Sequence, residues 1–97
     1  MGYRAKQPDG TVGGYEWMTY KEVYKIYDEL ARGCKALSLL KPIEGLNEDG
    51  REWAFSGVWA PNSWKWYTTS LASMTLKSTI VGFYSSMNDE QVNFCLD

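Results

Sequence analysis

Two apolar runs on either side of a helical segment constrain the fold of this chain most. Residues 53–60 read WAFSGVWA, with little polarity on either face, and residues 79–84 read TIVGFY, beginning with β-branched side chains. Such runs are typical of buried strands covered by helices on both sides. Because a helical segment lies between them, they predict two parallel strands joined by a right-handed crossover.

The segment between the two runs, residues 63–77, has the three- and four-residue repeat of a helix. Asn62 or Ser63 can cap its start. We expect its larger side chains to form the buried stripe, with Thr68, Ala72 and Thr75 beside it: Trp64, Tyr67, Leu71 and Met74.

A further helix is predicted after the second strand, within residues 85–97. Asn88 and Gln91 have the spacing of a capping box. Val92 and Cys95 are expected to face inward.

The N-terminal 18 residues predict a loop or hairpin followed by a short strand. Asp9-Gly10 and Gly13-Gly14 are turn signals within residues 1–14. Residues 15–18 then predict a strand that carries Tyr15 and Trp17 on one face.

A long helix is predicted over residues 19–40, because Thr19 and Glu22 fit the capping box and Pro42 lies beyond its end. Gly33 lies inside the helical repeat, and we expect it to pack closely against a neighbour. Residues 41–52 predict an acidic surface loop. The expected inward stripe of the helix has these members: Val23, Ile26 or Tyr27, Leu30, Cys34 and Leu37.

These elements predict an α/β fold: an N-terminal helix followed by a βαβα unit, residues 53–97, that belongs to a larger parallel-sheet subdomain. Two parallel strands make a poor free-standing sheet. We therefore expect the unit to be incomplete on its own and to expose a large apolar surface.

Composition excludes several classes of function. Ten Lys and Arg against twelve Asp and Glu leave no basic excess for nucleic acid. No apolar run is long enough to cross a bilayer, and the first ten residues lack the apolar core of a signal peptide. The chain has no histidine, which removes the commonest general base and metal ligand. Cys34 and Cys95 predict buried thiols in a reducing compartment, without a disulfide framework.

Residues 58–67, VWAPNSWKWY, place three indoles around one cation. Trp59, Trp64 and Trp66 beside Lys65 could form a platform that stacks on bases or sugars. They could equally be the end of a strand, a turn and the start of a helix, with Trp59 and Trp64 buried. Net charge and the apolar pattern on both sides favour the second interpretation.

Four ordered stretches resemble one family. They are YEWMTYKEVY, ARGCKAL, the strand that ends at Ala60 with Asn62 and Trp66 after it, and TIVGFYSSMNDEQVNFCL. Their order and spacing resemble the N-terminal region of long-chain fatty-acyl-CoA synthetases, which belong to the AMP-binding, adenylate-forming superfamily. The resemblance covers nearly the whole chain. In that family an aromatic-x-Trp-x-Thr/Ser-Tyr-x-Glu-Val segment opens the first helix.

Several positions depart from the family pattern. Ser63 and Lys65 stand where Arg and Glu are usual after the asparagine, and Pro61 stands where Lys is common. Gly82 replaces the usual proline of the second strand, and Ser85 replaces an aspartate. These changes keep the order and spacing of the four stretches and alter the surface chemistry of the turn at Asn62.

The resemblance implies a long-chain-fatty-acid–CoA ligase of fatty acid and lipid metabolism. In such an enzyme ATP and a fatty acid form an acyl-adenylate, and coenzyme A then displaces AMP. ATP, Mg²⁺ and CoA are implied for the whole enzyme. The resemblance also implies a cytoplasmic location, with peripheral attachment to the endoplasmic reticulum or another membrane as the alternative.

The catalytic pieces of the family have no counterpart in this sequence. It contains no Ser-Gly-Thr-Thr-Gly-x-Pro-Lys-Gly loop, no Tyr-Gly-x-Thr-Glu segment and no C-terminal lysine domain. We therefore assign no catalytic, cofactor-binding or metal-binding residue. We expect a truncated N-terminal piece, inactive alone, whose partner is the remainder of the ligase. The alternatives are a small aromatic-rich binding module and a regulatory fragment that competes for contacts within the intact enzyme.

Overall fold

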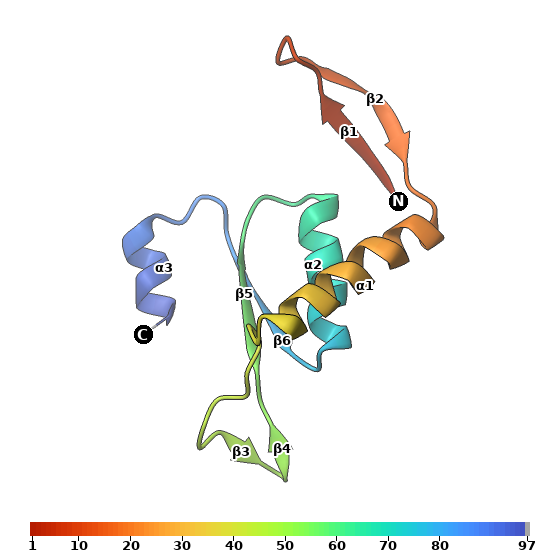
Figure 1. Cartoon of the computed structure of the whole chain (residues 1–97). Helices are drawn as coiled ribbons and strands as arrows, with labels where there is room; N and C mark the ends of the chain where they lie inside the picture. Colours follow the sequence, from red (N-terminus) through yellow and green to blue (C-terminus); the bar gives the residue numbers. More distant parts are fainter. Residues whose placement is uncertain (97) are drawn as a thin grey trace.

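The computed structural model describes residues 1–96, apart from the side chains of residues 47 and 48. The described residues form three helices and three pairs of short strands, arranged as in Figure 1. In chain order the elements are β1 (Gly2–Lys6), β2 (Val12–Trp17), α1 (Tyr20–Ala36), β3 (Asn47–Glu48), β4 (Arg51–Glu52), β5 (Phe55–Trp59), α2 (Trp64–Thr75), β6 (Thr79–Phe83) and α3 (Asp89–Leu96).

The predicted βαβ unit is confirmed. β5 and β6 pair in parallel, with Phe55 opposite Thr79 and Trp59 opposite Phe83. The Thr79 N–H donates to the Ala54 carbonyl (2.8 Å), which starts the ladder. α2 connects the strands and contacts both of them as well as α1. It is therefore the central element of the packed part of the molecule.

The buried face of α2 differs from the predicted stripe. Met74 is 61% exposed, and Tyr67 is also exposed. The buried side chains are small instead: Thr68, Ser70, Ala72 and Ser73. Close approach to α1 and to the strands leaves room only for small residues at the contact, so the larger side chains lie at its rim.

Two of the buried hydroxyls of α2, those of Thr68 and Ser73, bond back to the helix. Thr68 Oγ1 donates to the Lys65 carbonyl (3.1 Å), and Ser73 Oγ donates to the Thr69 carbonyl (2.9 Å). Every buried side-chain N or O atom of the described residues has a hydrogen-bond partner. A small polar core is thus tolerated because its polar atoms are satisfied locally.

The start of α1 confirms the predicted capping box. The Thr19 N–H donates to Glu22 Oε2 (2.7 Å), and the Glu22 N–H donates to Thr19 Oγ1 (3.3 Å). The helix ends at Ala36, four residues before the predicted boundary of 40. Ser38 takes a positive φ of 52°, and its N–H donates to the Lys35 carbonyl (3.1 Å), which closes the last turn.

Fewer side chains of the expected inward stripe of α1 are buried than predicted. Val23 and Ala31 are buried, whereas Leu30 and Leu37 are exposed. The expectation of close packing at Gly33 is wrong, since a Cβ added there would meet no atom within 4 Å. Only the part of α1 that faces α2 is covered.

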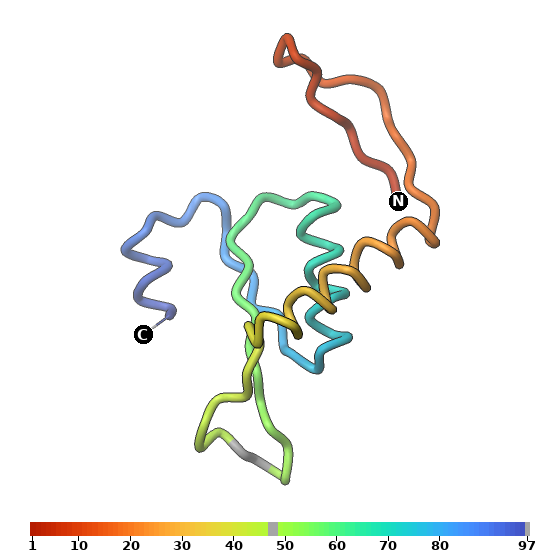
Figure 2. The backbone as a smooth tube through the Cα atoms, in the orientation of Figure 1, coloured from red at the N-terminus to blue at the C-terminus, as the bar shows by residue number. Residues whose placement is uncertain are grey.

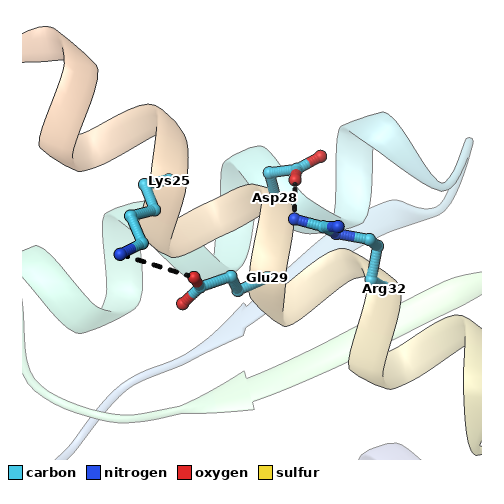
Figure 3. A network of polar contacts seen from close by, with 4 residues as sticks. All are labelled: Lys25, Asp28, Glu29 and Arg32. Atoms are coloured by element: carbon cyan, nitrogen blue, oxygen red, sulfur yellow. Dashed lines mark ion pairs between the residues drawn. The ribbon is translucent and has the colours of Figure 1, made fainter.

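Two ion pairs lie on the outer face of α1. Arg32 Nη2 lies 2.6 Å from Asp28 Oδ2, and Lys25 Nζ lies 3.9 Å from Glu29 Oε1. Figure 3 shows both pairs along the helix. Both pairs join residues four positions apart, which lie on the same face of a helix. They add local support to a helix that buries little.

The first 18 residues form a hairpin of two strands, so the hairpin alternative is confirmed, and β2 takes the place of the predicted strand over residues 15–18. β1 and β2 are antiparallel, and β2 begins at Val12, three residues before the predicted strand. The predicted turn at Asp9-Gly10 is confirmed by a positive φ of 85° at Gly10. Tyr15 and Trp17 share one face as expected, with ring centroids 6.0 Å apart.

The C-terminal helix, α3, is capped as predicted, but fewer of its side chains are buried than predicted. Asn88 Oδ1 accepts from the Gln91 N–H (2.9 Å), and the Asn88 N–H donates to Gln91 Oε1 (3.0 Å). Val92 is buried, but Cys95 is exposed, so its predicted inward position is wrong. α3 does not pack extensively against any other element. Asp97, the last residue of the predicted unit, lies outside the described residues.

The whole chain is extended for its size. Figure 2 shows the β1–β2 hairpin and the segment around β3 and β4 projecting from opposite sides of the central helices and strands. The accessible surface is 7862 Å², against roughly 5,700 Å² for a folded monomer of this mass. The radius of gyration is 16.0 Å, against about 12.5 Å for a compact domain. The α/β fold class is confirmed, and the unit leaves much apolar surface uncovered.

Candidate functional site

The three-indole segment is a strand–helix junction. β5 ends at Trp59, a turn covers residues 60–63, and α2 begins at Trp64. Ser63 caps the helix, because its Oγ accepts from the Trp66 N–H (3.3 Å). The predicted junction is therefore confirmed, with Ser63 rather than Asn62 as the cap.

Trp59 and Trp66 both reach the end of β6. The Trp59 Nε1–H donates to the Tyr84 carbonyl (3.1 Å). The Trp66 ring lies over Gly82, where an added Cβ would be 3.5 Å from the indole Cζ2. The first contact joins the ends of the two parallel strands, and the second joins the start of α2 to β6.

Trp64 lies against the N-terminal hairpin instead. Its ring centroid is 5.9 Å from that of Tyr3, with the planes tilted by 53°. The Lys65 ammonium lies 5.7 Å from the Trp64 centroid, within the range of a cation–π contact. Lys65 is exposed, so this contact adds little to stability.

The three indoles therefore contact two segments, the end of β6 and the N-terminal hairpin, and do not stack on one another. The expected burial of Trp59 and Trp64 is wrong: Trp59 is 45% exposed, and Trp64 is half-buried. Both remain accessible because nothing among the described residues covers this side of the junction. The indoles act as separate links between the junction and its neighbours.

A hollow of about 340 Å³ lies beside the junction, at the carboxyl ends of β5 and β6. In α/β sheets, this edge is where ligands most often bind. The sequence predicts parallel strands whose ends meet there, but not the approach of Tyr84 and Ser85 to Trp66. The lining residues are Ala60, Pro61, Asn62, Trp66, Gly82, Phe83, Tyr84 and Ser85.

The hollow has aromatic surface and neutral polar groups but no charged side chain in its lining. It therefore offers no carboxylate for Mg²⁺ and no cation for a triphosphate. Among the side chains that the structure describes, no group of three or more carboxylates or thiols is placed to hold a metal ion. The lining of this hollow does not fit ATP or its magnesium ion.

Three titratable groups have a shifted pKa, and of these Tyr3 contacts the junction through Trp64. The hydrogen bond from Tyr3 Oη to Glu16 Oε2 (2.7 Å) raises the pKa of Tyr3. Hydrogen bonds from Thr11 lower the pKa of Asp9, and those from Thr19 lower the pKa of Glu22. Each shift belongs to a turn, a strand pair or a helix cap, so none indicates catalytic chemistry.

The two thiols are also apart from the junction. Cys34 is half-buried and lines a hollow of about 410 Å³ between the ends of α1 and α2. Cys95 is exposed on α3. No helix in the described part of the chain is long and apolar enough to cross a membrane.

Comparison with known proteins adds no relative to this description. Neither a protein-family model, nor a curated protein, nor a solved structure matches the chain.

Proposed function

We propose that this chain forms a scaffold portion of a long-chain-fatty-acid–CoA ligase of the AMP-forming type, and that it carries none of the catalytic groups. In that setting long-chain fatty acid, ATP, Mg²⁺ and CoA would bind the remainder of the ligase. The location would be cytoplasmic, free or peripherally attached to a membrane. The ordered family-like motifs, from YEWMTYKEVY to TIVGFYSSMNDEQVNFCL, support the family assignment.

One observation carries the scaffold role: the parallel β5–β6 pair is covered on one face only. α2 contacts both strands, while Phe55 and Val81 on the other face stay exposed. A two-stranded parallel sheet with an open face needs further strands and helices for stability. The remainder of a ligase would supply them.

The chemistry of the junction agrees with a role outside catalysis. Acyl-adenylate formation needs cations or a metal ion near the phosphates. The hollow beside Trp66 has no charged lining, and the chain has no histidine. A scaffold role needs none of these groups.

A chimera tests this proposal. Residues 1–97 would replace the N-terminal region of a long-chain acyl-CoA ligase, and ATP- and CoA-dependent formation of palmitoyl-CoA would be measured. We expect the chimera to be active. A matched chimera in which Ala72 is replaced by Asp, at a position 2% exposed, should be inactive, because it buries an unpaired charge.

Two results would contradict the proposal. One is an inactive chimera, whether it is folded or not, beside an active parent ligase. The other is ATP–pyrophosphate exchange by the isolated chain with palmitate, because that reaction requires catalytic groups within these residues.

The second candidate is a small module that binds aromatic or sugar rings, and the hollow at Trp66 is the observation that favours it. Trp66 and Tyr84 line that hollow with Asn62 as a polar group. Titration with a nucleoside and with a monosaccharide, monitored by tryptophan fluorescence, separates the two candidates. A saturable change that disappears in Trp66→Phe would favour the binding module.

A further inference from the structure

Cations gather at one end of the molecule. The hollow of about 410 Å³ between the ends of α1 and α2 has three lysines and no carboxylate in its lining: Lys35, Lys41 and Lys77. A second hollow adjoins it, shares Lys77 with it, and adds Arg51 and Glu52. Four of the ten Lys and Arg therefore line the two hollows, and among the described side chains only one carboxylate does. In a chain of net charge −2, this is a local excess of positive charge.

The ends of two helices bring the three lysines together. α1 ends at Ala36 and α2 at Thr75, and Figure 1 shows both ends above the segment that carries β3 and β4. Lys35 lies in the last turn of α1, and Lys77 follows α2 with a positive φ of 57°. Lys41 belongs to the segment after α1. The three cations thus come from three separate segments.

No carboxylate among the described side chains forms an ion pair with these lysines. The two ion pairs of the described residues lie on α1 and join Lys25 to Glu29 and Arg32 to Asp28. Glu44 belongs to the same segment as Lys41 but lines neither hollow. An anion in the first hollow would therefore meet three cations without having to displace a described carboxylate.

Lysines near the ends of helices also balance the helix dipole, which accounts for part of this charge. The C-terminal end of a helix carries about −0.5 charge, so the two ends together offset about one lysine. Some of the last carbonyls are already occupied, since the Lys77 N–H donates to the Met74 carbonyl (3.0 Å). About two positive charges are left without a counterpart.

We propose that the hollow between the ends of α1 and α2 binds a phosphomonoester, with the phosphate among Lys35, Lys41 and Lys77. A phosphomonoester carries a charge of about −1.5 to −2 at pH 7, which matches the remaining positive charge. Lysine binds phosphate as a compact point charge with three donors. A carboxylate has one charge only and would leave part of the excess without a counterpart.

The remainder of the ligand would lie against apolar surface. Leu40, Pro42 and Leu76 supply this surface in the same lining. The volume of about 410 Å³ lies within the range of roughly 300–1,000 Å³ that is usual for small-molecule sites. The ligand class is therefore an organic phosphate with a small uncharged apolar group. Such a phosphate occurs free in solution or as the headgroup of a lipid.

The inference does not depend on the proposed function. The hollow lies at the ends of α1 and α2, whereas the further strands and helices of a ligase would cover the open face of β5 and β6. A failed chimera would leave the binding test unaffected, and failed binding would leave the chimera unaffected.

Neutral substitutions test the three lysines. Phenyl phosphate is the soluble probe, and the backbone amide shifts of the ¹⁵N-labelled full chain locate its site. Each of Lys35→Gln, Lys41→Gln and Lys77→Gln should weaken binding about two- to fivefold, as for exposed ion pairs. The triple variant should weaken it at least tenfold. Lys21→Gln is the matched control, because it removes the same charge from the exposed first turn of α1 and should leave binding unchanged.

The pH dependence separates a phosphomonoester site from a general anion site. The second pKa of a phosphomonoester is about 6, so phenyl phosphate should bind more weakly at pH 5.5 than at pH 7.5. Phenyl sulfate carries a single charge at both pH values and should bind weakly and equally at both. Circular dichroism like that of the wild type shows that each variant is folded at both pH values.

Vesicles distinguish the two sources of the phosphate. Co-sedimentation compares phosphatidylcholine vesicles that contain phosphatidic acid, a phosphomonoester, with vesicles that contain phosphatidylglycerol, a phosphodiester. Saturable binding of phenyl phosphate, with amide shifts at the hollow, supports a soluble ligand. Preferential binding to phosphatidic acid, lost in the triple variant, supports a lipid headgroup.

Three results would overturn the proposal. One is that neither phenyl phosphate nor phosphatidic acid binds in preference to its singly charged counterpart. Another is binding by the triple variant as strong as that of the wild type. The third is a Lys21→Gln variant that binds as weakly as a variant in the hollow, because this would show a response to net charge alone.

Discussion

α1 and α2 lie against each other but are stabilised in different ways. α1 has a complete capping box at Thr19 and two ion pairs on its outer face, and it buries only Val23 and Ala31. α2 has a single charged residue, Lys65, and buries four small side chains between α1 and the strands. Local interactions therefore support α1, whereas α2 depends on its neighbours. The comparison indicates that substitutions on the buried face of α2 should unfold the molecule, whereas substitutions in α1 should lower the free energy of unfolding by smaller amounts.

The largest effect is expected from overpacking the buried face of α2. Ala72 is 2% exposed, and Ala72→Leu should lower the free energy of unfolding by about 1–3 kcal/mol. Ala36→Leu is the matched control, because Ala36 lies exposed in the last turn of α1, and it should change stability by less than about 0.5 kcal/mol. Urea unfolding followed by circular dichroism measures both. Equal effects of the two substitutions would contradict the contrast between the helices.

The buried serine pair beneath α2 should come next. Ser56 Oγ and Ser78 Oγ are 2.6 Å apart, and Ser78 Oγ also donates to the Ala54 carbonyl (3.2 Å). Ser78→Ala leaves the Ser56 hydroxyl buried without this partner, which should cost about 1–3 kcal/mol. The double variant Ser56→Ala/Ser78→Ala should cost less than the sum of the single variants. Additive costs in this double-mutant cycle would show that the two hydroxyls are not coupled.

Removing the cap of α1 should have a smaller effect. Thr19→Ala removes the oxygen that accepts from the Glu22 N–H, and such changes cost about 1 kcal/mol. Thr19→Ser keeps the oxygen and should remain close to the wild type. The helical signal at 222 nm, recorded during urea unfolding, measures both variants. If Thr19→Ala lowered the free energy of unfolding as much as Ala72→Leu does, α1 would depend on its neighbours as much as α2.

The cap should also make α1 sensitive to acid. The hydrogen bonds from the Thr19 N–H and Oγ1 lower the pKa of Glu22 from its ordinary value of 4.5. Because the folded pKa lies below the unfolded one, the stabilisation is complete above pH 4.5 and is lost as pH falls through the lower folded value. We expect helicity to decrease over that range, and Glu22→Gln should remove this step. An identical acid titration of wild type and variant would contradict the assignment.

A stabilising change is expected within α1. Gly33 is helical and exposed, with open space where a Cβ would lie. Gly33→Ala should therefore raise the free energy of unfolding by about 0.5–1 kcal/mol. Gly57→Ala is the contrasting control, because its Cβ would lie 2.9 Å from the Phe83 ring, and it should destabilise. A destabilised Gly33→Ala would indicate that a neighbour packs against this position after all.

Local signals in the sequence were sufficient for some features. The caps at Thr19 and Asn88 were predicted, and Ser63 was one of the two residues predicted to cap α2, because each cap depends on side chains within three residues of the helix start. The parallel strands followed from the order of the apolar runs. The end of α1 could not be predicted, because Ser38 adopts a left-handed conformation without the usual glycine or asparagine.

Features that depend on contacts between elements were harder to predict. Side-chain size suggested that Tyr67 and Met74 would be buried, whereas close packing of α2 buried Ala72 and Ser73 instead. At the candidate site, the indoles were correctly placed at a strand–helix junction. Their separate contacts with Tyr3, Gly82 and Tyr84 depend on the three-dimensional arrangement of distant segments, which no local pattern encodes.

The central claim is that the chain alone is an incomplete α/β unit that leaves much of its apolar surface in water. The slope of the free energy of unfolding with urea tests this most directly, because it scales with the surface exposed on unfolding. The measurement is made on residues 1–97 at micromolar concentration. We predict a broad transition with a slope well below that of a compact domain of 97 residues. A sharp, cooperative transition with the full slope would contradict the account.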